Sequence, residues 1–214
     1  MTLLEMFENH KGLFTEKYPH HLEIYERYFS AFRGKDVGVL EIGIRDGGSL
    51  QLWREYFGEA AWIYGLDIQD RQHIEEEVRA EVFVGDQGDV QELRRILKSM
   101  RPLDIVIDDG SHVSLDQKQS FAELFPALRE GGIYVIEDIH TSYRAGYNDD
   151  TQLSFVEYLK EMIDSLHKNE QPGTIFFNEW EQVFAIHIYP SLAIIEKRNP
   201  RTWGGPTIRG THAI

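Results

Sequence analysis

The chain has 214 residues, of which 42% are hydrophobic and 27% charged, as expected for a globular protein with one α/β domain and a full hydrophobic core. Its formal net charge of -14 argues against a nucleic-acid backbone or an anionic membrane as the main partner, because both attract basic surfaces. The absence of cysteine excludes disulfides and thiolate metal sites.

No segment of the sequence is expected to direct the chain into a membrane or out of the cell. No apolar run approaches the roughly 18 residues that a membrane-spanning helix needs. The opening MTLLEMFENHKG contains no basic stretch leading into an apolar run, so no signal peptide is expected. Together with the lack of cysteine, these features predict a cytoplasmic protein.

Residues 1–34 are predicted to form an N-terminal helical segment, or lid, ahead of the main domain. The pattern is typical of a helix that turns one apolar face toward the core. The residues that recur at helical spacing are Leu22, Tyr25, Tyr28, Phe29 and Phe32.

The main domain is predicted to span residues 35–198, where short apolar runs alternate with amphipathic helical patterns. This alternation indicates βαβ units and a parallel sheet with buried strands. Gly131-Gly132 is read as the turn between the third of these helices and the fifth strand. The predicted strands are residues 37–42, 62–66, 81–84, 103–107 and 133–136. The predicted helices are residues 50–57, 90–100 and 117–128.

The end of the domain has a different pattern. Residues 183–189 and 192–197 are strand-like and are joined at Pro190-Ser191, which predicts an antiparallel hairpin. Five parallel strands closed by such a hairpin form the seven-stranded, Rossmann-like sheet of class I methyltransferases that use S-adenosylmethionine (SAM). Residues 199–214 are predicted to be a C-terminal tail.

The segment VLEIGIRDGGS contains the first strand, a glycine turn and the start of a helix. Gly43 permits a sharp turn, and Gly47 and the glycine after it permit close approach of a ligand to the helix N-terminus. A dinucleotide fingerprint would have its first glycine where this chain has Glu41. A carboxylate there suits the ammonium of a methionine moiety and repels a pyrophosphate, which favours SAM over NAD.

Two further strand ends carry polar residues that suit a nucleoside. Asp67 ends the second strand and could accept hydrogen bonds from both ribose hydroxyls. Asp86 and Gln87 follow the third strand, where a side chain could reach the adenine amino group. Each residue alone is explained as well by a turn or a cap, but three successive strand ends of this kind indicate a ligand crevice.

The fourth and fifth strands both end in paired carboxylates, Asp108-Asp109 and Glu137-Asp138. Four acids at one sheet edge repel each other unless they are protonated or bound to a cation. Oxygen ligation without cysteine suits Mg²⁺, or another divalent cation. Since alternate residues of a strand point to opposite sides, only one of Asp108 and Asp109 is expected to bind the metal. Alternatively, one acid of each pair caps the following helix.

Two histidines lie close to these acids. His112 follows Asp109 by three residues and could remove a proton from a hydroxyl held at the metal, so the two are predicted as the catalytic pair. His112 could alternatively orient a carboxylate or pack in its loop. His140 is a weaker candidate for the base and could instead support the Glu137-Asp138 pair.

The blocks VLEIGIRDGGSLQLWREYF, IYGLDIQDR, VIDDGSH and VIEDIHTSY resemble those of the metal-dependent sugar O-methyltransferases of macrolide and rhamnosyl antibiotic biosynthesis, over about residues 8–197. The resemblance implies SAM and Mg²⁺ as cofactors and His112 as the base. The metal ligands that it implies are Asp108 or Asp109, Glu137 and Asp138. The SAM-pocket residues that it implies are Glu41, Gly43, Ser49, Asp67 with the adjoining Ile68, Asp86 and Gln87, with Asp108 bordering them.

The predicted function is therefore metal-dependent methylation of a small-molecule hydroxyl, a sugar of a glycosylated natural product, by a chain that could form homo-oligomers. A catechol or other phenol remains an alternative acceptor, because a vicinal diol also chelates Mg²⁺. An NAD-dependent oxidoreductase or an inactive SAM-binding module is disfavoured by Glu41 and by the intact acid pairs. Residues 141–151 are the candidate acceptor loop. The aromatic residues that could stack on an acceptor ring are Tyr18, Tyr25, Tyr28, Tyr143 and Tyr147.

Overall fold

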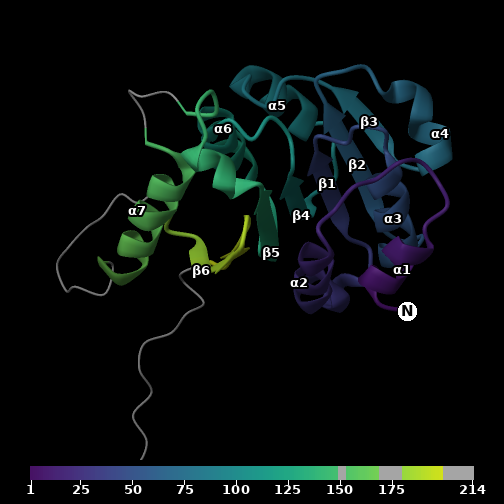
Figure 1. The fold of residues 1–214 in the computed structure, drawn as a ribbon, viewed down its shortest axis with the longest axis horizontal. Coiled ribbons are helices and arrows are strands. Elements are labelled where there is room, and N and C mark those ends of the chain that lie inside the picture. The colour runs from purple at the N-terminus through teal and green to yellow at the C-terminus, as the bar shows by residue number, and fades with distance from the viewer. Residues whose placement is uncertain (149–152, 169–179, 200–214) are drawn as a thin grey trace, which may run out of the picture.

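The computed structural model describes residues 1–148, 153–168 and 180–199, and a single seven-stranded sheet forms its centre (Figure 1). The strands are β1 (Gly38–Ile42), β2 (Trp62–Asp67), β3 (Glu81–Val84), β4 (Leu103–Asp108), β5 (Leu128–Glu137), β6 (Val183–Tyr189) and β7 (Leu192–Lys197). Their order is β3-β2-β1-β4-β5-β7-β6. The first five strands are parallel, whereas β7 is antiparallel to both β5 and β6. The predicted sheet and its closing hairpin are confirmed.

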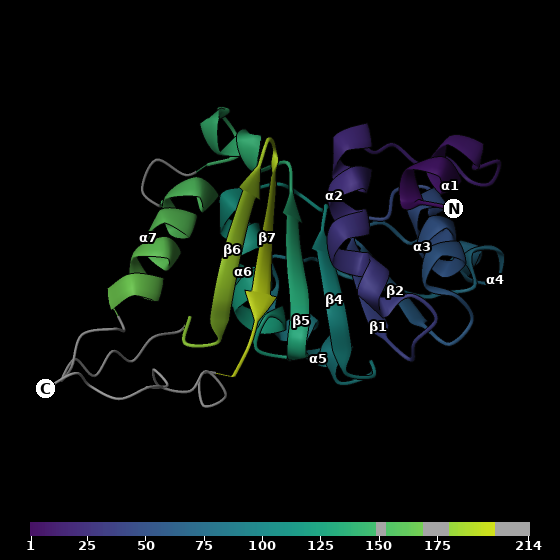
Figure 2. The same cartoon turned by 90° about the horizontal axis from the view of Figure 1, so that it is seen from below.

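Helices cover both faces of this sheet, as Figure 2 shows. The α-helices are α1 (Leu3–Asn9), α2 (Pro19–Phe29), α3 (Gly48–Phe57), α4 (Glu75–Val78), α5 (Val90–Leu97), α6 (Ser114–Leu124) and α7 (Phe155–Lys168). The 3₁₀ helices are η1 (Ser30–Phe32), η2 (Gln72–Ile74) and η3 (Ile139–Tyr143). Helices α1 to α4 pack on one face, and α5, α6 and α7 pack on the other. None of the helices in the described part of the chain is long and apolar enough to cross a membrane.

Alternation along the strands divides the core into two layers. Ile105 and Ile107 of β4 and Val135 of β5 face α1–α4, while Val106 and Tyr134 face α5–α7. This follows from the two-residue period of a strand, whose successive side chains point to opposite faces. The same alternation therefore decides which face each acid at a strand end will occupy.

The N-terminal helices share a core with the sheet. Tyr25 and Phe29 of α2 are fully buried, and both rings contact Trp53 of α3. Helix α1 begins with a capping box, in which the Thr2 hydroxyl accepts from the Glu5 amide and the Glu5 carboxylate accepts from the Thr2 amide. Packing of residues 3–29 against β1 and β4 brings this segment to the functional edge of the sheet.

The predicted boundary between α6 and β5 is wrong. Helix α6 ends at Leu124, four residues before the predicted end, and β5 has already begun at Leu128. Gly131-Gly132 therefore lies within β5, where the pairing passes from Leu128 directly to Ile133. Gly131 has φ +78°, and the register of β5 against β4 shifts here, so the glycine pair lies in a bulge of the strand. Helices α4 and α7 were not predicted, whereas α1 lies in the segment that was predicted to be helical. Residues 149–151 of the candidate acceptor loop and 200–214 of the tail lie outside the described residues.

Candidate active site

A pocket of about 570 Å³ opens at the carboxyl ends of β1, β2, β4 and β5. This is the edge of an open α/β sheet at which ligands usually bind. Residues 14–19, which precede α2, form the wall opposite the strand ends. Of the predicted site residues, the pocket is lined by Gly43, Ser49, Asp67, Asp109, His112, Glu137 and Asp138.

The glycine turn after β1 is constrained by its neighbours. Gly43 has φ +81°, and a Cβ built on it would lie 2.2 Å from the carbonyl oxygen of Asp109, so only glycine fits. Gly47, with φ +85°, caps α3 and packs against Ile74 of η2. The Phe14 carbonyl accepts a hydrogen bond from the Gly48 amide at 3.3 Å, which ties the pocket wall to the N-terminus of α3.

Asp67 fastens this turn to the end of β2. Its Oδ2 accepts from the backbone amides of Ile44 and Arg45, both at 3.1 Å, and its Oδ1 accepts from the Gln69 amide at 2.9 Å. Ile68, the next residue, is 69% exposed and lies outside the pocket lining. Asp67 thus borders the pocket in a fixed orientation that is set by backbone donors.

Glu41 lies beneath the pocket instead of within it. Its side chain is 1% exposed, and its Oε2 accepts from the Ser49 hydroxyl at 2.5 Å and from Trp53 Nε1 at 3.1 Å. Its Oε1 is 3.1 Å from Nζ of Lys17. The predicted contact between Glu41 and a ligand ammonium is therefore not available in this structure, because the protein supplies the cation itself.

The residues after β3 and the first aspartate of β4 form a separate, internal network. Asp108 is fully buried, and its carboxylate accepts from Gln87 Nε2 at 3.0 Å, Ser120 Oγ at 2.6 Å and the Tyr134 hydroxyl at 3.2 Å. Gln87 Oε1 in turn accepts from the Ser111 amide at 2.6 Å. Burial raises the pKa of Asp108, although these hydrogen bonds oppose the rise.

This network bears on two predictions. Asp108 contacts Ser120 of α6, on the opposite side of the sheet from the pocket, so the structure does not bring it together with the other predicted metal and SAM residues, and strand alternation leaves Asp109 as the pocket acid. The Gln87 amide is bonded within the protein at both ends, to Asp108 through Nε2 and to the Ser111 amide through Oε1. Asp86 is exposed, and its Oδ1 accepts from the Gly88 amide at 2.8 Å.

Three carboxylates from neighbouring strands surround the ammonium of Lys17. We call Glu41, Asp109 and Glu137 the inner acid cluster. Nζ of Lys17 lies 3.1 Å from Glu41 Oε1, 2.5 Å from Asp109 Oδ2 and 2.6 Å from Glu137 Oε1. The Lys17 side chain is 2% exposed. Sequence reasoning did not identify this lysine, although it is the counter-ion of every acid in the cluster.

The pKa values record the balance of charge in the cluster. Burial lowers the pKa of Lys17, but the three acids outweigh it and hold that pKa well above its usual value. For Glu137, burial raises the pKa, whereas Lys17 and His21 lower it to about 2. Burial and the nearby Glu137 raise the pKa of Asp109 despite its contact with Lys17. One ammonium is therefore too little for three carboxylates, and the uncompensated charge lies at Asp109 on the pocket side.

Helix α2 supplies two more groups to this cluster that sequence reasoning missed. The Tyr25 hydroxyl donates to Glu137 Oε1 at 2.7 Å, and His21 Nδ1 is 3.2 Å from Glu137 Oε2. Burial together with Glu137 raises the pKa of Tyr25, so the phenol keeps its proton. Lys17, His21 and Tyr25 are spaced four residues apart, and this polar spacing was the available signal, although α2 begins only at Pro19 and Lys17 precedes it.

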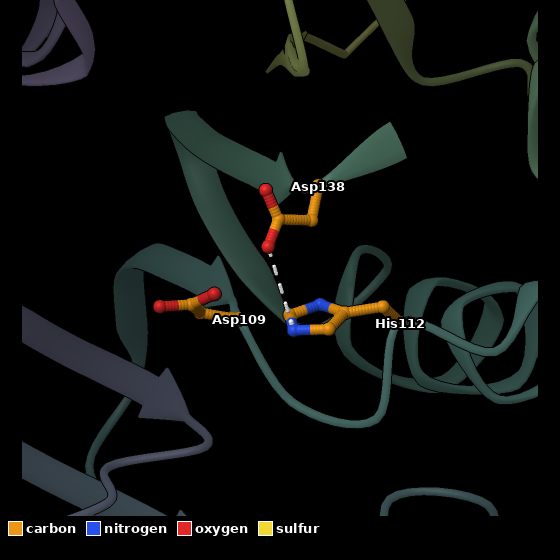
Figure 3. A group of neighbouring side chains, drawn as sticks. All are labelled: Asp109, His112 and Asp138. Carbon is orange, nitrogen blue, oxygen red and sulfur yellow. Dashed lines mark ion pairs between the residues drawn. The ribbon is translucent and has the colours of Figure 1, made fainter. Parts of the chain in front are cut away.

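A second group of ligand-type side chains lies on the open side of Asp109. We call Asp109, His112 and Asp138 the outer group, and Figure 3 shows these three side chains, with a dashed line for the ion pair between His112 and Asp138. Each offers one ligand atom, and these atoms lie within 4.8 Å of one another. His112 Nε2 is 3.6 Å from Asp138 Oδ2, and His112 Nδ1 has no hydrogen-bond partner among the described residues.

Asp138 is supported from its other side by the turn between β6 and β7. Ser191 Oγ donates to Asp138 Oδ1 at 3.2 Å, and His140 Nδ1 lies 2.5 Å from the same Ser191 hydroxyl. His140 Nδ1 is also 3.6 Å from Asp138 Oδ1. His140 thus contacts the back of Asp138 while His112 faces the pocket, and this arrangement favours His112 as the base.

Backbone conformations rare for non-glycine residues gather at this edge. His112, Asp138 and Ser191 have φ values of +57°, +54° and +63°, and Arg45 of the glycine turn has +50°. Among the described residues, only Arg79 at the end of α4 shares this property. Such strain persists where the surrounding structure fixes it and is concentrated at functional sites.

The donor set fits a hard divalent cation. The outer group combines carboxylate oxygens with one imidazole, and it adjoins acids whose charge Lys17 leaves partly uncompensated. Of the aromatic residues predicted to stack on an acceptor, Tyr18 lines the pocket and Tyr143 is 77% exposed. Tyr25 is buried against Glu137, and the Tyr28 hydroxyl is 2.8 Å from that of Tyr189, so neither is free to stack.

The strand order, the glycine turn and a pocket at the carboxyl edge define a class I methyltransferase fold. Residues 40–139 match the family Methyltransf_24, a methyltransferase domain. The chain is a class I methyltransferase by fold, and it resembles sugar O-methyltransferases of antibiotic pathways in sequence.

Three comparisons make this resemblance concrete. An 8-demethyl-8-alpha-L-rhamnosyl tetracenomycin-C 2'-O-methyltransferase from Streptomyces olivaceus is 40% identical over 195 residues, covering 85% of this chain and 51% of that protein. The mycinamicin VI 2''-O-methyltransferase from Micromonospora griseorubida is 39% identical, covering 86% and 49%. The MycE methyltransferase of the mycinamycin pathway, solved with Mg, SAH and mycinamycin VI, superposes with a TM-score of 0.84 at 36% identity.

These similarities cover nearly all of this chain but only part of the proteins compared. The MycE match includes 97% of this chain and 56% of that one. The chain thus spans about half the length of the curated relatives it matches.

Proposed function

We propose that the chain transfers a methyl group from SAM to a hydroxyl of a small molecule with the help of a divalent cation. The observation that carries the proposal is that one pocket joins Asp67 and the glycine turn to Asp109, His112 and Asp138. A nucleoside-type site beside a base and an acid group is the arrangement that this reaction requires.

The methyl donor is proposed to bind between the glycine turn and Asp67. Gly43 permits close approach, and Asp67 borders the pocket with Oδ1 accepting one backbone hydrogen bond, so this oxygen can also accept from a ribose hydroxyl. Asp86 remains the proposed residue on the adenine side. When bound, SAM supplies a sulfonium methyl group whose carbon is open to attack.

The metal ligands are proposed to be Asp109 and Asp138, with Glu137 next to them. A bound Mg²⁺ would neutralise this edge and lower the pKa of a neighbouring hydroxyl. The raised pKa of Asp109 supports this assignment, because a second cation relieves the repulsion between Asp109 and Glu137. The solved complex of MycE with Mg and SAH supports Mg²⁺ and SAM as the cofactors.

His112 is the proposed general base. Its side chain is 22% exposed in the pocket, and Asp138 lies 3.6 Å away, where it can stabilise the imidazolium after proton transfer. The acceptor oxygen loses its proton to His112 and attacks the methyl carbon as the carbon–sulfur bond breaks, which leaves S-adenosylhomocysteine. Positioning should provide much of the rate enhancement, because the sulfonium is already a good leaving group.

The acceptor is proposed to be a sugar hydroxyl of a glycosylated natural product, and we place the reaction in the cytoplasm. The names of the similar proteins support a sugar, since they act on rhamnosyl tetracenomycin and mycinamicin. Tyr18, which is exposed and lines the pocket, could stack on a sugar ring or on an aryl ring.

The proposal is tested by incubating the 214-residue chain with methyl-labelled SAM and a panel of rhamnosylated polyketides, macrolides and catechols. Label should enter a sugar-bearing acceptor, should disappear with EDTA and should return with Mg²⁺. Transfer that is unaffected by EDTA would contradict metal assistance, and transfer to catechols alone would replace the sugar by a phenol.

A further inference from the structure

Lys17 is the only residue outside the strand ends that contacts all three members of the inner acid cluster, within the described part of the chain. Its distances to Asp109 Oδ2 and Glu137 Oε1, 2.5 and 2.6 Å, are those of charge-assisted hydrogen bonds. Its ammonium therefore occupies the centre of a carboxylate cluster that would itself suit a cation. The proposed reaction gives this buried lysine no role.

The inner acid cluster and the outer group overlap at Asp109. In each of the two sets, one ligand atom per residue lies within 4.8 Å of the others. Glu41 and Glu137 are buried with Lys17 between them, whereas His112 and Asp138 are 22% and 25% exposed toward the pocket. The edge thus contains two neighbouring cation positions, of which the inner one is filled by the protein.

The chain on both sides of Lys17 is anchored. The Leu13 amide donates to Gln51 Oε1 at 2.8 Å, and the Phe14 carbonyl accepts from the Gly48 amide. Two residues after Lys17, Pro19 begins α2, whose Tyr25 donates to Glu137. Because helix and loop are both fixed to the sheet, the ammonium is held in the cluster by the fold as well as by charge.

We propose that Lys17 is a built-in cation that fills the inner acid cluster and thereby confines the divalent cation to Asp109 and Asp138 of the outer group, beside the base His112. The inference rests on the proposed function, because it concerns where the metal of that reaction binds. Lys17 takes one oxygen each of Glu41, Asp109 and Glu137, and its charge repels a second cation from the inner position. Lys17 is thus a positioning residue that sets the distance between the metal and the base.

The test measures Mn²⁺ binding by electron paramagnetic resonance of the free ion, with the full chain and no acceptor. Lys17→Met should bind Mn²⁺ more tightly by roughly 10-fold or more, because a unit positive charge is removed from beside the ligands. Lys17→Arg, which keeps the charge, should remain within about 3-fold of wild type. Lys11→Met, an exposed lysine of the same segment, is the matched control and should change nothing.

Asp138→Asn shows which of the two positions the Mn²⁺ ion occupies. In the wild-type background this change should weaken Mn²⁺ binding by roughly 10-fold or more, because the outer group loses a charged ligand. In the Lys17→Met background the same change should have an effect of less than about 3-fold, because the ion then binds at Glu41, Asp109 and Glu137. Asp109→Asn should weaken binding in both backgrounds, since both positions use this residue.

The proposal is overturned if Asp138→Asn weakens binding equally in both backgrounds, or if Lys17→Met leaves the affinity unchanged. Lys17→Gln provides a second neutral variant if Lys17→Met fails to fold, and circular dichroism with S-adenosylhomocysteine binding checks each protein. A wild-type chain that binds no Mn²⁺, beside a Lys17→Met variant that does, would overturn the proposed binding at the outer group together with the proposed metal-assisted reaction.

Discussion

The two halves of the pocket are held together in different ways. On the donor half, Asp67 is fixed by backbone amides of residues 44, 45 and 69, which belong to the same glycine turn and strand end. On the acid half, carboxylates are fixed by side chains from far along the chain. Lys17 is separated by 92 residues from Asp109 and by 120 from Glu137.

Because of this difference, the two halves of the pocket should respond differently to changes in charge and pH. Backbone donors follow from the path of the chain, so the donor half should tolerate changes in charge and pH. The acid half is balanced by one ammonium, and a single substitution or a proton alters it. The following predictions test this contrast in order of decreasing effect.

The largest effect is expected for His112→Ala. Removal of the base should lower turnover by roughly 10²–10⁴-fold, while affinity for S-adenosylhomocysteine stays near wild type because the donor half is intact. Single-turnover kinetics and calorimetry separate the two quantities. His140→Ala is the matched control, since His140 contacts the back of the same Asp138, and an equal loss in both variants would remove His112 from its special role.

Glu137→Gln should change the pH dependence of stability. The pKa of Glu137 falls from 4.5 to about 2 in the folded chain, so the ionised form stabilises the fold above pH 4.5, and this contribution is lost as the pH falls toward 2. Wild type should exceed the variant by up to roughly 3 kcal/mol at neutral pH and converge with it in acid. Urea unfolding in EDTA from pH 2 to 7 measures this difference.

Asp109→Asn should have a different effect on the pH dependence of stability from Glu137→Gln. The pKa of Asp109 is raised, so its contribution has the opposite sign and is lost as the pH rises through the folded value. Asp109→Asn should therefore cost less at neutral pH than Glu137→Gln. A stability difference between wild type and Glu137→Gln that is constant from pH 2 to 7 would show that Glu137 does not carry the charge of the cluster.

On the donor half, Asp67→Asn should weaken binding of S-adenosylhomocysteine by roughly 10- to 100-fold, because a charged acceptor of hydrogen bonds is lost. Mn²⁺ binding should be unchanged, since the acid half is built separately. Asp70→Asn is the matched control, an exposed aspartate three residues away whose Oδ1 accepts from the Gln72 amide. Coupled losses of nucleoside and metal binding would show that the two halves are not independent.

The smallest effect is expected for Ser191→Ala, which removes the hydroxyl that donates to Asp138. Turnover should fall by roughly 10-fold, as for other residues that orient a metal ligand. The pH–rate profile should also shift, because Asp138 faces His112. A fall in thermal stability with an unchanged profile would assign Ser191 a structural role alone.

The sequence predicted the sheet well because each strand carries its own local pattern. Residues 81–84, 183–189 and 192–197 were predicted with the bounds that the structure has, and the strands β1, β2 and β4 differ from their predictions by one residue at one end. Strand β5 begins five residues before its predicted start. The prediction failed at the start of β5, where the glycine pair was predicted to end the preceding helix. Gly131-Gly132 favours a turn in any context. In the structure this pair lies inside β5, at a bulge between two parts of the strand that pair with β4.

The sequence by itself therefore determined the fold class and the kinds of residue at each strand end, because periodicity and residue type are local properties. Only the tertiary structure decided what those residues do. Alternation along β4 turned Asp108 toward Ser120 and Asp109 toward the pocket. Docking of α2 placed Lys17, His21 and Tyr25 on the acids, across more than 90 residues of chain. No local pattern encodes such a contact, since it exists only when distant segments share one core.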